Sequence, residues 1–269
     1  MNGMDRITSD PKGIHSVHSV HSVKDSVLDP REFTARIGAA ARAAGFRVDP
    51  FGEIAGVPLL GLTRRTPGPR PRIYISAGIH GDEPAPPLTL LELIERGIFD
   101  DRAVWFLCPL LNPVGFTRRT RENADGIDLN RDYKALRSLE IQAHARWLRA
   151  QPNFDLVLCV HEDWESKGYY LYELNPTNRP SLAQPMIDAV AQVCPIETAT
   201  VIDGREISEP GIIRPASDPL LRELWPESIY LRAHHTRLSY TLETPSSFPL
   251  AQRIAAHRAA IETAIGGLH

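Results

Sequence analysis

The alternation of apolar and polar positions predicts strands and helices that follow one another along most of the chain. Between residues 30 and 44, apolar side chains recur at the spacing of an amphipathic helix, and Gly45 follows as a stop signal. Residues 46–63 alternate short apolar runs with glycines, which predicts two hairpin strands. Further strands are expected at 73–79, 103–110, 155–160, 169–174 and 237–243, and further helices at 85–96, 138–150, 182–193 and 248–265.

Several of these strands are apolar on both faces, which is typical of strands that are covered by helices on each side. Strands that alternate with helices favour an α/β fold, here a three-layer sandwich in which helices cover a mixed, largely parallel and twisted sheet. Residues 112–133 interrupt the pattern, because they are rich in Asn, Asp, Gly and Arg and predict a long irregular loop.

The first residues differ from the rest of the chain. Residues 14–23 contain His-Ser-Val three times between polar flanks, a composition with little apolar surface to bury. The three histidines can weakly hold a metal, but no carboxylate or cysteine lies among them, and a disordered tail over 1–29 is the preferred interpretation. Residues 30–269 are then expected to form one catalytic domain.

Composition excludes several classes of protein. The 269 residues are 42% hydrophobic, and 30 basic against 33 acidic side chains give a net charge of −3, too little for a nucleic-acid or membrane-surface partner. Three widely spaced cysteines give no disulfide framework, and no apolar run suits a signal peptide or a membrane span. We therefore expect a cytoplasmic protein, with its oligomeric state left open.

Polar residues at the ends of two predicted strands suggest a metal site. His80 and Glu83 follow the strand at 73–79, and His161 follows the strand at 155–160. The carboxyl ends of parallel strands meet at one edge of a sheet, and two histidines with one carboxylate form the donor set of many catalytic zinc sites. Each residue alone also has a purely structural explanation, since Glu83 suits a helix N-terminus and His161 suits a hydrogen-bonded core position.

Two other regions offer groups for catalysis. In the loop at 112–133, Arg121, Asn130 and Arg131 can bind a carboxylate or donate to a developing oxyanion, although a solvated polar loop is the simpler interpretation of any single arginine. Glu243 lies at the end of the strand at 237–243, on its polar face. Beside a metal site, this carboxylate can act as a general base.

Together these motifs resemble the zinc carboxypeptidases of the M14 family, in which they occur in the same order. The resemblance extends from about residue 73 to residue 245. Residues 161–173 are in addition similar to a small bacterial branch related to a rapid-encystment carboxypeptidase. The matching segments are Gly78-Ile-His80-Gly-Asp-Glu83, Asn112-Pro-Val-Gly-Phe116, Arg121, Asp128-Leu-Asn130-Arg131, His161 and Tyr240-Thr-Leu-Glu243.

The resemblance implies a zinc metallocarboxypeptidase that hydrolyses the C-terminal amide bond of a peptide or of a small carboxylate-bearing amide. One Zn²⁺ ion would be held by His80, Glu83 and His161, while Arg121 would polarise the oxyanion. Asn130 and Arg131 would bind the terminal carboxylate of the substrate, and Glu243 would be the catalytic base. The family's substrate-capping tyrosine has no clear counterpart, because its usual region holds Leu220 and Leu221 while Tyr230 lies further along.

Two alternatives stay open. A more distant resemblance to succinylglutamate desuccinylase and aspartoacylase, which share the His-Gly-x-Glu and Asp-Leu-Asn-Arg segments, implies an N-acyl amino acid deacylase. The stretch His161-Glu-Asp-Trp-Glu and the short remainder after Glu243 favour the carboxypeptidase instead. The second alternative is a non-catalytic zinc or peptide-binding module, which would need neither Glu243 nor Arg121.

Overall fold

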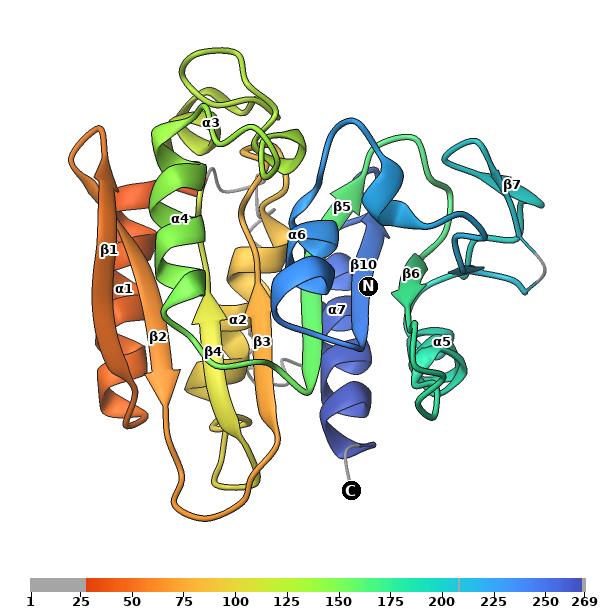
Figure 1. Cartoon of the computed structure of the whole chain (residues 1–269), viewed down its shortest axis with the longest axis horizontal. Helices are drawn as coiled ribbons and strands as arrows, with labels where there is room; N and C mark the ends of the chain where they lie inside the picture. Colours follow the sequence, from red (N-terminus) through yellow and green to blue (C-terminus); the bar gives the residue numbers. More distant parts are fainter. Residues whose placement is uncertain (1–27, 208, 268–269) are drawn as a thin grey trace, which may run out of the picture.

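One eight-stranded sheet forms the centre of the molecule (Figure 1). The computed structural model describes residues 28–207 and 209–267. From one edge to the other the strands are β1 (Arg47–Ile54), β2 (Val57–Arg64), β4 (Val104–Cys108), β3 (Arg72–Ser76), β5 (Leu156–Asp163), β10 (Ser239–Pro245), β6 (Tyr170–Leu174) and β9 (Ile212–Ile213).

The four central strands β4, β3, β5 and β10 are parallel to one another, and the outer pairs β1–β2, β2–β4 and β10–β6 are antiparallel. Helices cover both faces of this sheet (Figure 1). On one face lie α1 (Pro30–Ala43), α2 (Ala85–Glu95), α5 (Ala183–Val190) and α7 (Leu250–Gly266), and on the other lie α4 (Leu139–Arg149) and α6 (Glu227–His234). The expected three-layer sandwich with a mixed, largely parallel sheet is confirmed.

The side-chain alternation of the central strands decides which groups reach the candidate site. On β5, Leu158 and Val160 pack in the core beneath α2 and α7, so that Cys159 and His161 face the layer of α4 and α6. On β10, Tyr240 and Leu242 belong to the same core as Leu158. The opposite face of β10 therefore presents Thr241 and Glu243, as its sequence predicts.

Most of the expected elements are present, with shifts of a few residues at their ends. Asp29 begins α1 by accepting from the backbone N–H groups of Arg31 and Glu32, and Ser138 caps α4 in the same way. The predicted strand at 155–160 was too short, because pairing with β10 continues β5 to Asp163. His161 thus lies within a strand, where its ring direction is fixed by the sheet.

The pattern analysis did not predict the short elements. These are α3 (Pro113–Arg118), α6, β7 (Val201–Ile202), β8 (Arg205–Glu206), β9 and the 3₁₀ turns η1 (Leu129–Arg131) and η2 (Pro219–Leu221). Apart from α6, which has eight residues, each spans only two to six residues, too few for an apolar period to repeat. The helix expected at 182–193 also ends earlier, at Val190.

The histidine-repeat tail expected at 1–29 falls outside the described residues except for Leu28 and Asp29. Leu28 is buried in the core beside α1.

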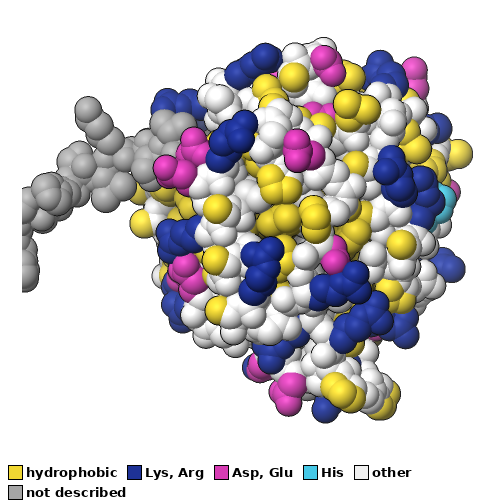
Figure 2. Space-filling model, turned by 90° about the vertical axis from the view of Figure 1, so that its left-hand side faces the viewer, with side chains coloured by type: hydrophobic (Ala, Val, Ile, Leu, Met, Phe, Trp, Pro, Cys, Tyr) yellow, Lys and Arg dark blue, Asp and Glu magenta, His cyan; other side chains and the backbone are white. Residues whose placement is uncertain are grey.

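Within the described part of the chain, no helix has both the length and the apolar character needed to cross a bilayer. At the β1 edge, basic and acidic side chains divide the exposed apolar ones into small groups (Figure 2).

A buried hydrogen-bond chain joins α4 to the sheet. His144 on α4 lies with Nδ1 2.6 Å from the hydroxyl of Tyr133 and Nε2 3.0 Å from that of Tyr74 on β3. Tyr74 donates its only proton to Glu227 at 2.7 Å, so the Nε2–H of His144 donates to Tyr74 and Nδ1 accepts from Tyr133. Burial lowers the pKa of His144 to about 3, which keeps this imidazole neutral near pH 7.

Replacing His144 by glutamine is expected to weaken the pH dependence of stability. The unfolded chain binds a proton at His144 below about pH 6.5, whereas the folded protein does not. The stability that this group contributes is therefore complete above pH 6.5 and is lost as the pH falls toward 3. Urea unfolding should show the difference between wild type and His144→Gln shrinking by about 2 kcal/mol from pH 7.5 to pH 5. A constant difference would contradict the assigned neutral state.

Candidate active site

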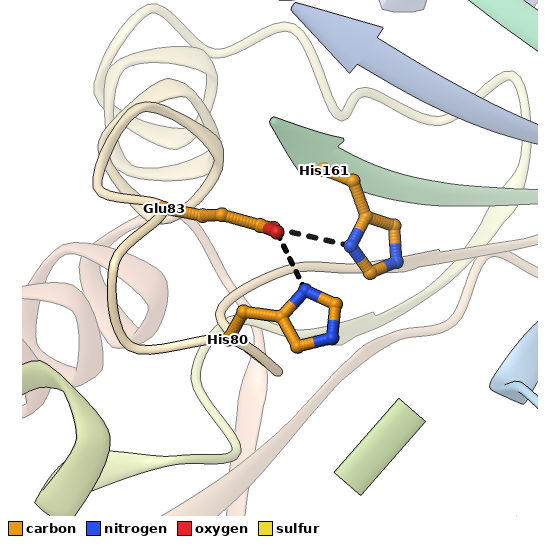
Figure 3. Close-up of side chains that lie close together, drawn as sticks. All are labelled: His80, Glu83 and His161. Carbon is orange, nitrogen blue, oxygen red and sulfur yellow. Dashed lines mark hydrogen bonds and ion pairs between the residues drawn. The ribbon is translucent and has the colours of Figure 1, made fainter. Parts of the chain in front are cut away.

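His80, Glu83 and His161 converge at the carboxyl edge of the sheet (Figure 3). His80 lies in the turn after β3, Glu83 stands just before α2, and His161 lies on β5. The Glu83 carboxylate sits between the two rings, with Oε1 2.5 Å from Nδ1 of His80 and Oε2 3.1 Å from Nδ1 of His161. All three side chains are buried. The structure thus brings together the three residues that the sequence analysis expected to bind a metal.

The chemistry of this cluster fits a divalent metal ion. Each residue offers one ligand atom, and these atoms lie within 4.8 Å of one another. Burial alone would lower the pKa of His80, but Glu83 and Asp128 raise it, and the two imidazoles hold the pKa of Glu83 well below its usual range despite burial. Two imidazole nitrogens with one carboxylate form a donor set that suits zinc.

Asp128 and Arg121 form the next layer around the cluster. Asp128 Oδ1 lies 3.3 Å from Nε2 of His80, and its Oδ2 accepts from Nε of Arg121 at 2.9 Å. A carboxylate on the far nitrogen fixes the ring so that Nδ1 faces the cluster. Arg121 Nη1 lies 3.7 Å from Glu83 Oε1. Arg118 and Arg119, by contrast, are exposed.

The segment that begins at Asn112 supports the turn that carries His80. Asn112 accepts from the backbone N–H of Gly115 and donates to the carbonyl of Arg121, so it both caps α3 and holds the arginine's backbone. Gly81 packs directly against this helix, where a Cβ atom would lie 1.9 Å from the carbonyl carbon of Gly115. Only glycine therefore permits the close approach of the two segments.

Asn130 presents its amide NH₂ group toward the cluster. Its Oδ1 accepts from the backbone N–H of Glu227 at 2.9 Å, which leaves Nδ2 3.5 Å from Nε2 of His161. Arg131 donates to the carbonyl of Asn130 through Nη1 and also lines the cavity. Both residues are thus placed where their N–H groups can meet a carboxylate.

Glu227 is a residue of the site that the sequence analysis missed. It is fully buried, and its carboxyl group accepts from the hydroxyls of Tyr74 and Ser76 at 2.7 Å each. Burial raises its pKa, and these hydrogen bonds oppose the rise. The Glu227 side chain holds the first turn of α6 against β3. This contact positions the backbone N–H of Glu227, which orients Asn130. The only signal in the sequence was the pair Tyr74 and Ser76, whose polar groups lie on one face of the otherwise apolar β3 and need a buried hydrogen-bond partner.

Glu243 lies beside the metal-binding residues. It is the direct register partner of His161 on the neighbouring parallel strand, and it lines the same cavity. Burial raises the pKa of Glu243 to about 8, with a contribution from the charge of Glu83 and opposition from His161 and Arg121. The raised pKa makes Glu243 a stronger proton acceptor than an ordinary carboxylate.

A cavity of about 620 Å³ opens over these residues. Its far wall consists of Tyr170 and Tyr172 on β6 together with β7 and β8. Tyr170 donates to Asp163 at 2.9 Å and Tyr172 donates to Asp203 at 2.5 Å. Tyr230 lies elsewhere, buried against Tyr133. The cavity is lined by His80, Glu83, Arg121, Asn130, Arg131, His161 and Glu243 among others.

Several solved structures with the same architecture are described as metallopeptidases or metallo-carboxypeptidases. A proposed metallopeptidase from Shewanella amazonensis SB2B is 28% identical with a TM-score of 0.76, over 87% of this chain and 91% of that one. A second, from Shewanella denitrificans OS217, is 26% identical with a TM-score of 0.75, over 86% and 87%. A metallo-carboxypeptidase from Pseudomonas aeruginosa shares the fold at 22% identity and a TM-score of 0.62, over 88% and 68%.

The sequence itself matches the family model of the succinylglutamate desuccinylase/aspartoacylase catalytic domain over residues 69–210, slightly more than half of the chain. That span includes the three metal-binding candidates, Asn130 and Arg131, and it ends before Glu243. A search of curated protein sequences gives no match. The family resemblance expected from the motifs is confirmed. The family model that matches is the one for which the motifs had indicated the more distant resemblance. This chain belongs to the succinylglutamate desuccinylase/aspartoacylase family, and it shares its fold with the metallo-carboxypeptidases.

Proposed function

We propose that this protein is a zinc-dependent metallocarboxypeptidase, which hydrolyses the C-terminal amide bond of a peptide or of a small carboxylate-bearing amide. The observation that carries the proposal is the convergence of three kinds of group on one cavity. These are the metal donors His80, Glu83 and His161, the buried carboxyl group of Glu243, and the cationic or amide groups of Arg121, Asn130 and Arg131.

Each residue has a role that follows from its position. Zinc, when bound, lowers the pKa of water toward neutrality and polarises a carbonyl group. Glu243 would accept the proton of the attacking water and pass it to the leaving nitrogen, a role that needs the ionised carboxylate. Burial raises the pKa of Glu243, and a divalent cation held beside it would favour the ionised form. Arg121 donates to the developing oxyanion, an interaction typically worth about 3 kcal/mol.

Asn130 and Arg131 orient the substrate by its carboxylate. Fixing the carboxylate holds the scissile amide at a constant distance from Glu243, so that binding energy lowers the barrier to the reaction. The Pseudomonas aeruginosa metallo-carboxypeptidase was solved in complex with (2-guanidinoethylmercapto)succinic acid, a small carboxylate compound of the kind that such donors would bind. That likeness supports a carboxylate-bearing substrate for this chain.

The second candidate is an N-acyl amino acid deacylase, and the family match favours it. Its substrate also carries a carboxylate next to the scissile amide, so the same residues would serve. The Shewanella amazonensis neighbour, at 28% identity over most of both chains, supports the peptidase. The two candidates differ in what lies on the acyl side of the bond.

Zinc binding is expected to depend on the three clustered residues. Purified wild-type protein should contain one zinc ion per chain by elemental analysis, and its melting temperature should fall when a chelator removes the ion, because an ion that binds only the folded state stabilises it. His161→Ala should lose most of the bound zinc. Equal zinc content in wild type and His161→Ala would contradict the assigned site.

Glu243→Gln should separate metal binding from turnover. The amide has the shape of the carboxyl group but cannot accept a proton, so we expect a loss of about 10²- to 10⁴-fold in kcat with zinc content unchanged. Steady-state hydrolysis of any confirmed substrate provides the measurement. Near-normal activity in this variant would exclude Glu243 as the base.

A substrate panel should reveal the role of Arg131 and separate the two candidates. Wild type is expected to cleave peptides with a free C-terminus and to fail on the amidated forms, because the amide cannot form the charge-assisted hydrogen bonds. Arg131→Ala should lose most of this discrimination, while Arg118→Ala, which changes an exposed arginine at the end of α3, should keep it. Faster hydrolysis of N-acetyl aspartate or N-succinyl glutamate than of any peptide would establish the deacylase instead.

A further inference from the structure

Large apolar side chains lie exposed around the mouth of the cavity. Trp164, in the loop after β5, is 74% exposed, and Val201 on β7 is 54% exposed. Both line the cavity. Leu221, at the end of η2, is 82% exposed and stands between Pro219 and Arg222, which also line it. We call Trp164, Val201 and Leu221 the apolar rim.

Exposure of such groups around a polar site points to a ligand. A tryptophan in contact with solvent is unfavourable unless a partner covers it, and tryptophan is the residue type most enriched among the anchors of binding surfaces. Trp164 is flanked by Glu165 and Lys167, which are exposed and opposite in charge. Asp203, Arg205 and Arg222 also line this part of the cavity, so charges of both signs surround the rim. Apolar contact is what the rim residues themselves offer to a ligand.

The order of groups from the interior to the mouth identifies the occupant. Asn130 is buried beside His161, whereas Trp164 and Val201 line the same cavity and are largely exposed to solvent. A substrate whose carboxylate is bound by Asn130 and Arg131 extends from there past Glu243 toward the mouth. The portion on the acyl side of the scissile bond then lies against the rim.

We propose that the apolar rim is an outer subsite for an aromatic or large aliphatic group on the acyl side of the scissile amide. This inference rests on the proposed function and names its substrate class. Peptides with an apolar residue before the C-terminal residue can cover Trp164, whereas an acetyl group is too short to reach beyond the inner cavity. The rim thus favours a peptide substrate over a small N-acyl amino acid.

The test compares two peptides that differ at one residue, Gly-Phe-Xaa and Gly-Gly-Xaa, where Xaa is the C-terminal residue that wild type releases fastest, or alanine if wild type releases none. We expect KM to be at least about tenfold lower for the phenylalanine peptide, as for other well-buried apolar groups. Trp164→Ala should bring the two KM values within about twofold of each other. Leu139→Ala is the matched control, since Leu139 is 68% exposed on α4 and does not line the cavity. This control should keep the wild-type preference.

Binding without turnover separates a failure of the subsite from a failure of the proposed function. Calorimetric titration of zinc-loaded Glu243→Gln with the same two peptides should reproduce the preference. If neither peptide is hydrolysed by wild type yet the preference in binding persists, the proposed function is overturned and the subsite stands. Equal binding of the two peptides overturns the subsite. A wild type that is dimeric by light scattering, with a monomeric Trp164→Ala, also overturns it, because the rim would then bind a second copy.

Discussion

The parallel pairing of β3, β5 and β10 is the constraint on which the candidate site depends. It brings the carboxyl ends of three strands to one edge, although their residues are distant in sequence, and it sets Glu243 directly opposite His161. Because side chains alternate along a strand, a slip of one residue in this register would turn His161 into the apolar core beside Val160. The apolar residues that fix the register therefore also fix the geometry of the catalytic groups.

Burial gives neighbouring carboxyl groups different chemical properties. Glu83 lies between two imidazoles, which keep its pKa low and leave it ionised as a metal ligand. For Glu243, His161 and Arg121 only partly offset burial, which raises its pKa to about 8. Glu227 is buried farther back and accepts two hydroxyl hydrogen bonds. Different surroundings thus suit three buried carboxyl groups to the three roles proposed for them, as metal ligand, proton acceptor and positioning group.

The long elements were predictable because their signals are local. The strand–turn–helix around His80 and the apolar run of β5 are visible in consecutive residues, and they led to the metal-binding cluster. The short elements were not, since α6 and the β7–β8 hairpin are held by distant contacts. Glu227 donates to Asn130 across a separation of 97 residues, which no window on the sequence reveals. The same limitation concealed the far wall of the cavity, where Tyr172 is tied to Asp203 on a hairpin of two-residue strands.

The proposed catalytic side and the rim of the cavity are built from different kinds of structure. From Tyr133 through His144, Tyr74 and Glu227 to Asn130, one hydrogen-bond chain locks α4, β3 and α6 together behind the carboxylate-binding group. Such buried networks hold a site in one geometry. The rim, in contrast, lies on the loop after β5, on a minimal hairpin and on a single 3₁₀ turn. Substitutions in the rim would therefore leave the hydrogen-bond chain behind Asn130 intact, which separates the proposed choice of acyl group from the proposed hydrolysis.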